Sequence, residues 1–174
     1  MSSILTRAGL DRRTGNFLGV LACLALIAYA LFVQYGMHVE PCPLCILQRV
    51  SVITAGVLFL VAAVHDPEDR GAKVYGFLID LATLSGIAIA ARHMWIIAQP
   101  PGSVAECGAN LGYMMDVLPL HEVLGKILKG SGECAKIDWH FLGLNMPTWV
   151  LMALVCVGLW GLLVNWFAPS VRHS

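Results

Sequence analysis

Two cysteines separated by two residues, Cys42 and Cys45, give this sequence its clearest capacity for chemistry. A disulfide between them would close a very small ring, so it would add little to stability. The pair precedes an apolar run typical of a helix, and a helix N-terminus favours a thiolate. Arg49 follows Cys45 by four residues on the same helix face, and its positive charge favours that thiolate further. The spacing therefore predicts redox chemistry rather than a structural staple.

The other four cysteines fall into two groups. Cys107 and Cys134 lie in a long segment between apolar runs, whereas Cys23 and Cys156 lie inside such runs and are expected to be buried and free. Four thiolates can bind zinc, but the second pair lacks the short spacing of the first, and an oxidising compartment disfavours free thiols. We therefore predict no metal site.

The composition indicates an integral membrane protein. Hydrophobic residues make up 58% of the 174 residues and charged residues only 13%, too few for the surface of a soluble domain of this size. Eleven basic residues balance eleven acidic ones, which excludes a basic nucleic-acid-binding protein. The high apolar content excludes a disordered chain.

Four apolar stretches are long enough to cross a bilayer, and they predict an all-α bundle of four transmembrane helices. The expected spans are residues 17–34, 46–64, 74–98 and 147–168 of a single membrane domain that covers residues 1–174. The runs are continuous rather than alternating, which argues against a barrel. The first run is longer than that of a cleaved signal peptide, so we expect it to be retained.

The distribution of Lys and Arg predicts the orientation of the bundle. Six of these residues lie in the N-terminal segment, the 64–74 turn and the C-terminal tail, against three in the two opposite loops, 35–45 and 99–146. Both termini are therefore expected in the cytoplasm. The four loop cysteines are then expected on the outer, oxidising side.

The second outer loop contains a further element. Apolar residues recur there at helical spacing, with charged residues between them, and predict a short amphipathic helix on the membrane surface. They are Leu120, Val123, Leu124, Ile127 and Leu128.

Two of the ionisable residues inside the expected spans are candidates for function. Arg49 could snorkel to the lipid headgroups, but its position one turn from Cys45 favours a functional role. His93 is expected at the same depth and could donate a hydrogen bond to a bound carbonyl group. The sequence assigns no role to Asp80.

Taken together, these features resemble the DsbB family of bacterial inner-membrane proteins, which reoxidise the periplasmic thiol oxidase DsbA with quinone. The resemblance rests on the 41–45 segment Pro-Cys-Pro-Leu-Cys, on Arg49, on the Cys107 and Cys134 pair, and on the 139–149 segment that enters the last span. It implies a quinone, ubiquinone or menaquinone, bound near Cys45, Arg49, His93 and Met146. Gln48 departs from relatives that carry an acidic residue there.

The resemblance also implies an order of thiol exchange. A reduced DsbA-like partner would attack the Cys107–Cys134 disulfide and form a mixed disulfide with Cys107. Cys134 would then attack Cys42 and release Cys45 as the thiolate that delivers electrons to the quinone.

Two alternatives remain open at this point. A protein similar to vitamin K epoxide reductase would also have four helices and a quinone, but its two cysteine pairs would occur in the reverse order. A structural tetraspan protein would use the loop cysteines only to brace the loop, and it would show no quinone-dependent turnover.

Overall fold

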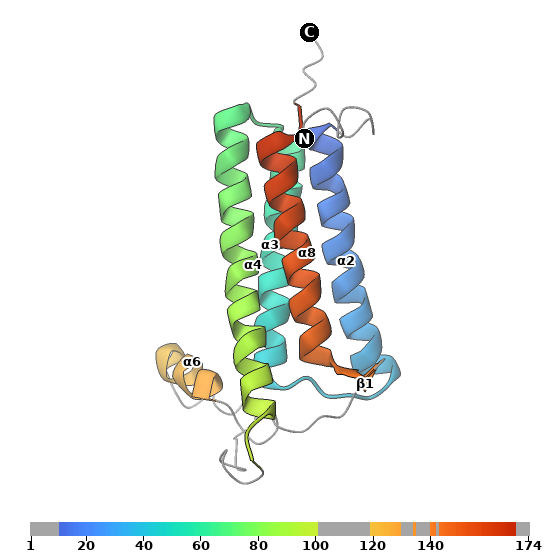
Figure 1. Ribbon diagram of the computed structural model, residues 1–174, viewed down its shortest axis with the longest axis vertical. Helices are drawn as coiled ribbons and strands as arrows, with labels where there is room; N and C mark the ends of the chain where they lie inside the picture. Colours follow the sequence, from blue (N-terminus) through green and yellow to red (C-terminus); the bar gives the residue numbers. More distant parts are fainter. Residues whose placement is uncertain (1–10, 101–118, 130–133, 135–139, 142, 170–174) are drawn as a thin grey trace.

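The computed structural model describes residues 11–100, 119–129, 134, 140–141 and 143–169. In this part of the chain four helices are long and apolar enough to cross a membrane, which confirms the predicted fold class. They are α2 (Arg12–Gly36), α3 (Pro43–His65), α4 (Asp69–Ile97) and α8 (Met146–Phe167), and they run side by side as an up-and-down bundle (Figure 1).

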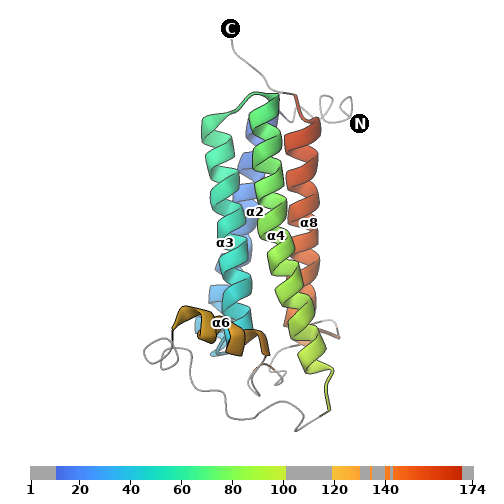
Figure 2. The ribbon, with the colours of Figure 1, turned by 90° about the vertical axis from the view of Figure 1, so that its left-hand side faces the viewer.

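The four helices follow one another around the bundle. α2 packs on α3, α3 on α4 and α4 on α8, while contacts between α2 and α8 close the ring. Figure 2 shows the same arrangement from the side, with the short helix α6 (Leu120–Lys129) beside the lower end of α3. Toward one end of the bundle, the ring encloses a cavity lined by residues of all four helices.

Phe59 fills the centre of the bundle and is fully buried. Two glycines make room for its ring: a Cβ added to Gly19 would lie 2.6 Å from Phe59 Cδ1, and one added to Gly161 would lie 3.2 Å from Cζ. On the outside, apolar side chains such as Phe17, Phe32 and Phe77 are exposed. An apolar exterior is what a lipid-facing surface requires, so the burial pattern fits a membrane bundle.

A reciprocal amide pair joins α2 to α8 inside the bundle. Asn16 Nδ2 donates to Asn165 Oδ1 at 3.2 Å, and Asn165 Nδ2 donates to Asn16 Oδ1 at 3.0 Å and to the carbonyl of Gly161 at 3.0 Å. Both side chains are buried. Polar pairs of this kind hold membrane helices together because lipid offers no alternative partner.

Replacing Asn165 with alanine should therefore lower the free energy of unfolding by about 1 kcal/mol. The loss arises because Asn16 keeps a buried amide without its partner. Denaturation of the purified protein in detergent micelles measures the effect, and the Asn16→Ala/Asn165→Ala double variant serves as the control. The double variant should lose less than the sum of the single variants. Additive losses would show that the two amides do not stabilise each other.

Arg12 connects several chain segments at one end of the bundle. Its guanidinium donates to the carbonyls of Pro67 at 3.2 Å and Ala168 at 3.0 Å, and it pairs with Asp69 at 2.9 Å. These contacts join the start of α2, the turn between α3 and α4, and the end of α8. The segments expected to be cytoplasmic are thus held together at one end.

The opposite end is capped by α6 and a short hairpin. The predicted amphipathic helix is present, but its apolar residues Val123 and Ile127 pack against Leu44 of α3 and Ile96 of α4 rather than on the membrane surface as predicted. An apolar stripe fits a protein surface as well as a lipid one, so the sequence pattern does not distinguish them. The sequence did not predict the two short strands β1 (His140–Phe141) and β2 (Leu144–Asn145), which pair as an antiparallel hairpin. Gly143, with φ of 79°, turns the chain between them.

The helices begin earlier than the sequence predicted. α2 starts at Arg12 and α3 at Pro43, because prolines and polar residues are accepted in a first helical turn.

One of the two cysteines within the spans differs from expectation. Cys23 is buried as expected, but Cys156 is exposed on the outer surface of α8. That prediction was wrong because a small apolar residue fits a lipid-facing surface as well as a core.

Candidate functional site

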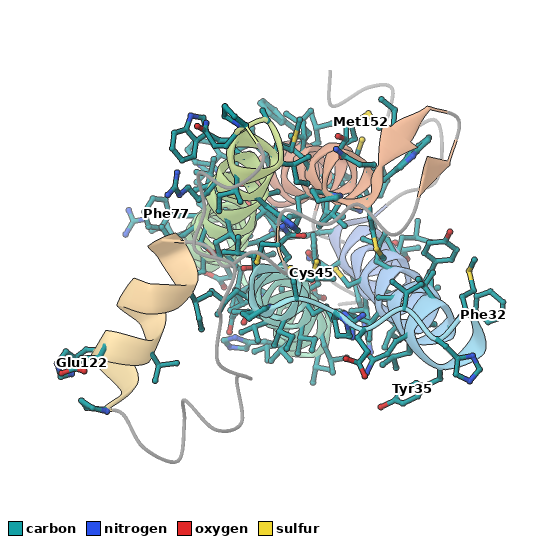
Figure 3. The ribbon with its side chains drawn as sticks, turned by 90° about the horizontal axis from the view of Figure 1, so that it is seen from below. Phe32, Tyr35, Cys45, Phe77, Glu122 and Met152 are labelled. Carbon is teal, nitrogen blue, oxygen red and sulfur yellow. The ribbon has the colours of Figure 1, made fainter. Side chains whose placement is uncertain are left out.

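The Cys42–Cys45 pair occupies the N-terminus of α3. Cys42 is the N-cap residue and Pro43 takes the first helical position, where proline's missing N–H is no loss. Cys42 Sγ accepts a hydrogen bond from the backbone N–H of Cys45 at 3.4 Å, and the two sulfur atoms lie 3.3 Å apart. Figure 3 shows Cys45 near the centre of the bundle, while Phe32 and Tyr35 point outward. The first turn of α3 thus holds the two sulfur atoms side by side, as formation of a disulfide between them requires.

His93 of α4 lies directly against this pair. Its side chain is only 4% exposed, with Nε2 3.7 Å from Cys42 Sγ and Nδ1 3.9 Å from Cys45 Sγ. Nε2 also lies 3.1 Å from the backbone carbonyl oxygen of Cys134. A carbonyl can only accept, so Nε2 carries a proton in this contact, and whenever the ring is neutral its unprotonated Nδ1 faces Cys45.

Cys134 is brought to the same place from the second loop. It is 1% exposed and belongs to an apolar cluster with Leu44, Ile96, Val123 and Ile127. Cys42 packs against that cluster. Three of the four predicted redox cysteines therefore lie together, beneath the buried face of α6. Cys107, the fourth, lies outside the described residues.

A cavity of about 450 Å³ opens beside the cysteines, between α2, α3, α4 and α8. Its wall contains all four residues predicted to contact the cofactor: Cys45, Arg49, His93 and Met146. Most of the remaining wall is apolar, contributed by residues such as Leu26, Ile27, Val33, Val52, Ile97 and Val150. A mostly apolar cavity of this size with a few polar groups suits a small aromatic or quinonoid ring.

Arg49 uses its guanidinium to contact α2. Nη2 donates to the carbonyl oxygen of Ala30 at 3.1 Å, and Nη1 donates to Oε1 of Gln34. The sequence placed Arg49 one turn from Cys45 but gave no sign of these two acceptors. They hold the positive charge at the cavity wall, at the level of the cysteine pair.

Gln48 is a cavity residue that was not among the site residues predicted from the sequence. It lines the cavity and is 2% exposed. The available signal was a polar residue within an apolar span, three positions after Cys45, where a helix returns to the same face.

The cysteine pair and His93 also have the composition of a metal site. Their sulfur and nitrogen atoms lie within 4.8 Å of one another, and Zn²⁺ accepts such donors. Geometry alone therefore admits both redox and metal chemistry. Comparison with known proteins distinguishes between the two.

Helices long and apolar enough to cross a membrane, with a close cysteine pair at one end, fit a multi-pass membrane thiol–disulfide oxidoreductase, and the family match establishes this class. The family model described as "Disulfide bond formation protein DsbB" matches residues 12–164. The chain belongs to this family of quinone-linked, inner-membrane thiol oxidases, and it is an enzyme of disulfide bond formation.

Curated relatives named "Disulfide bond formation protein B" support the assignment. The protein of Methylobacillus flagellatus is 49% identical over 152 residues, covering 87% of this chain and 92% of the relative. That of Methylococcus capsulatus is 46% identical, covering 90% of this chain and 95% of the relative. That of Chromobacterium violaceum is 48% identical over 88% of this chain and 92% of the relative. These similarities favour redox chemistry over a metal site at the cysteine pair.

Proposed function

We propose that this protein reoxidises a periplasmic DsbA-like thiol oxidase and passes two electrons to a membrane quinone, either ubiquinone or menaquinone. One observation carries the proposal: Cys45, Arg49, His93 and Met146 line one cavity, beside Cys42. A thiol pair against a cavity of the right size and polarity is the arrangement that electron transfer from sulfur to a quinone needs.

The exchange begins at the second loop. A thiolate of the reduced partner attacks Cys107, forms a mixed disulfide and releases Cys134 as a thiolate. The second thiolate of the partner then breaks the mixed disulfide, so the partner leaves oxidised and Cys107 is reduced. The burial of Cys134 in the cluster that Cys42 packs against supports the next step, attack of Cys134 on Cys42.

That attack forms a Cys42–Cys134 disulfide and releases Cys45 as a thiolate, which faces the cavity. A quinone bound there supplies an acceptor for two electrons and two protons. Cys107 then attacks Cys134, which restores the Cys107–Cys134 disulfide and releases the Cys42 thiol. When Cys42 and Cys45 close to a disulfide again, their two electrons and two protons pass to the quinone, so the net change is oxidation of one partner dithiol and reduction of one quinone.

The surrounding residues assist Cys45 in separate ways. Arg49 places a positive charge at the cavity wall, which favours both the thiolate and negative charge that develops on the acceptor. His93 Nδ1 lies 3.9 Å from Cys45 Sγ, close enough to exchange a proton with that sulfur during the cycle. Met146 and the apolar wall exclude water from the ring.

Turnover of a reduced DsbA-like protein tests the proposal. The purified protein in detergent should oxidise many equivalents of the partner when ubiquinone is supplied, as followed by alkylation of the remaining partner thiols. Without quinone, oxidation should stop after the protein's own disulfides are consumed. A structural tetraspan protein would show no difference between the two conditions. A chelator such as EDTA should leave turnover unchanged, whereas a functional metal at the cysteine pair would make it fall.

We also propose that both termini lie in the cytoplasm and that the cysteine end lies in the periplasm. The concentration of Arg12, Arg13, Arg70 and Lys73 at the opposite end supports this orientation. Reporter domains fused after Lys73 and after Ser131 should therefore report opposite sides of the membrane. Reporters on the same side would remove the oxidising environment that the loop cysteines need.

Arg49 provides a test of the cavity as the quinone site. Arg49→Ala should weaken apparent quinone affinity by about tenfold or more, because it removes a charge-assisted donor. Arg49→Lys should lose less: it keeps the charge but cannot contact Ala30, Gln34 and a ring together. Titration of ubiquinone at a fixed partner concentration measures both.

Arg92→Lys is the matched control for Arg49→Lys, because Arg92 stacks on Trp95, 4.1 Å from the ring centroid, and does not line the cavity. Its apparent quinone affinity should equal that of the wild-type protein. Unchanged affinity in Arg49→Ala would show that this arginine only anchors α3 to α2.

A further inference from the structure

Gln48 carries an amide group that the folded protein leaves unsatisfied. Its side chain is 2% exposed, and within the described part of the chain Nε2 has no hydrogen-bond partner. Burying a donor without an acceptor is destabilising, so such groups are rare and call for an explanation. Gln48 also lines the cavity beside Cys45, so a molecule in the cavity can supply the missing acceptor.

The neighbouring donors differ from Gln48 in that they already have partners. Arg49 donates to Ala30 and Gln34 of α2, and His93 Nε2 donates to the carbonyl of Cys134. Gln48 reaches the cavity from the helix face that carries Cys45, three residues earlier. Its amide is thus positioned for an acceptor that lies close to the reacting sulfur.

We infer that Gln48 Nε2 donates a hydrogen bond to a carbonyl oxygen of the bound quinone and thereby positions the ring beside Cys45. The inference rests on the proposed quinone site and adds a positioning residue to it. A neutral amide donates at every pH at which the protein folds. A carboxyl group at this position would donate only when protonated, so the amide makes this one hydrogen bond independent of pH, although His93 and Cys45 of the same cavity can titrate.

Direct binding of a short-chain ubiquinone to the purified, partner-free protein tests this role. Trp149 lines the same cavity, so saturable quenching of tryptophan fluorescence reports occupancy without turnover. Gln48→Met keeps the length of the side chain and removes the donor, and it should raise the Kd about tenfold. Gln99→Met makes the same chemical change outside the cavity lining and should leave the Kd unchanged.

Thermal unfolding of the quinone-free proteins separates positioning from a structural role. Because Gln48→Met removes an unsatisfied buried donor, its melting temperature should equal or exceed that of the wild-type protein while its affinity falls. Gln48→Glu should lose affinity for the quinone more steeply than the wild-type protein as pH rises. A Kd within twofold of wild type in Gln48→Met, or a matching fall in melting temperature, would overturn the inference.

The binding measurements test the quinone site and the role of Gln48 separately. If the wild-type protein binds the quinone but Gln48→Met binds it equally well, the quinone site stands and only the role of Gln48 is wrong. If the wild-type protein shows no saturable binding, the proposed quinone site itself is wrong, and this inference fails with it.

Discussion

Replacing Cys45 with alanine should abolish quinone-dependent oxidation of the partner, with a loss of about 10³-fold or more. Cys42 and Cys45 both line the cavity, but in the proposed exchange Cys42 is held in the disulfide with Cys134, so Cys45 is the thiolate left at the acceptor. Multiple-turnover oxidation of a reduced DsbA-like protein, with ubiquinone in excess, measures the loss.

Cys156→Ala is the matched control for this variant. It removes a thiol of the same kind from the exposed outer surface of α8, away from the site, and it should turn over at the wild-type rate. Cys45→Ala should also fold normally, because Cys45 is only half-buried and the N-cap contact of its backbone N–H with Cys42 remains. Persistent turnover in Cys45→Ala would assign electron delivery to another residue.

Replacing Cys134 with alanine should halt the cycle one step earlier and trap the partner. Without Cys134, Cys107 stays a free thiol, so the partner is supplied as a variant that keeps one cysteine, activated as its mixed disulfide with 5-thio-2-nitrobenzoate. Cys107 displaces that leaving group and forms a mixed disulfide with the partner, and neither protein then holds a thiol placed to resolve it. We expect a stable covalent adduct on non-reducing gels and almost complete loss of turnover. Peptide mapping of the adduct should identify Cys107.

The structure supports the use of alanine at this position. His93 contacts the backbone carbonyl of Cys134, so this contact survives the change. The apolar cluster around Cys134 loses only a sulfur atom. The Cys107→Ala/Cys134→Ala double variant is the control and should form no adduct. An adduct that maps to Cys42 would reverse the predicted order of the two cysteine pairs.

Features that depend on residues close together in the sequence could be predicted without a structure. The long apolar runs had to become helices, because lipid offers no hydrogen-bond partner for exposed backbone. Cys42, Cys45 and Arg49 lie within two turns of one helix, so their relation follows from helical geometry alone. The amphipathic helix α6 could be predicted in the same way, because its apolar residues recur every three or four positions with charged residues between them.

The contacts between helices were decided only by the tertiary structure. His93 meets the thiols of Cys42 and Cys45 across about fifty positions of sequence, and Arg49 finds its acceptors on α2. The unsatisfied amide of Gln48 likewise becomes visible only when the neighbouring helices are in place. These contacts depend on how each helix is rotated about its own axis.

The rotation of each helix is difficult to predict from the sequence of a membrane bundle. A soluble helix marks its inner face with apolar residues and its outer face with polar ones, but lipid accepts apolar residues on both. Phe59 is fully buried whereas Phe17, Phe32 and Phe77 face outward, and nothing in their residue type distinguishes them. The inner face is set instead by close packing, as where Gly19 and Gly161 accommodate Phe59, and by polar pairs such as Asn16 with Asn165. The sequence by itself therefore determined the helices, the cysteine motif and the chemical class, while the packing of helix against helix decided which residues surround the reacting sulfur.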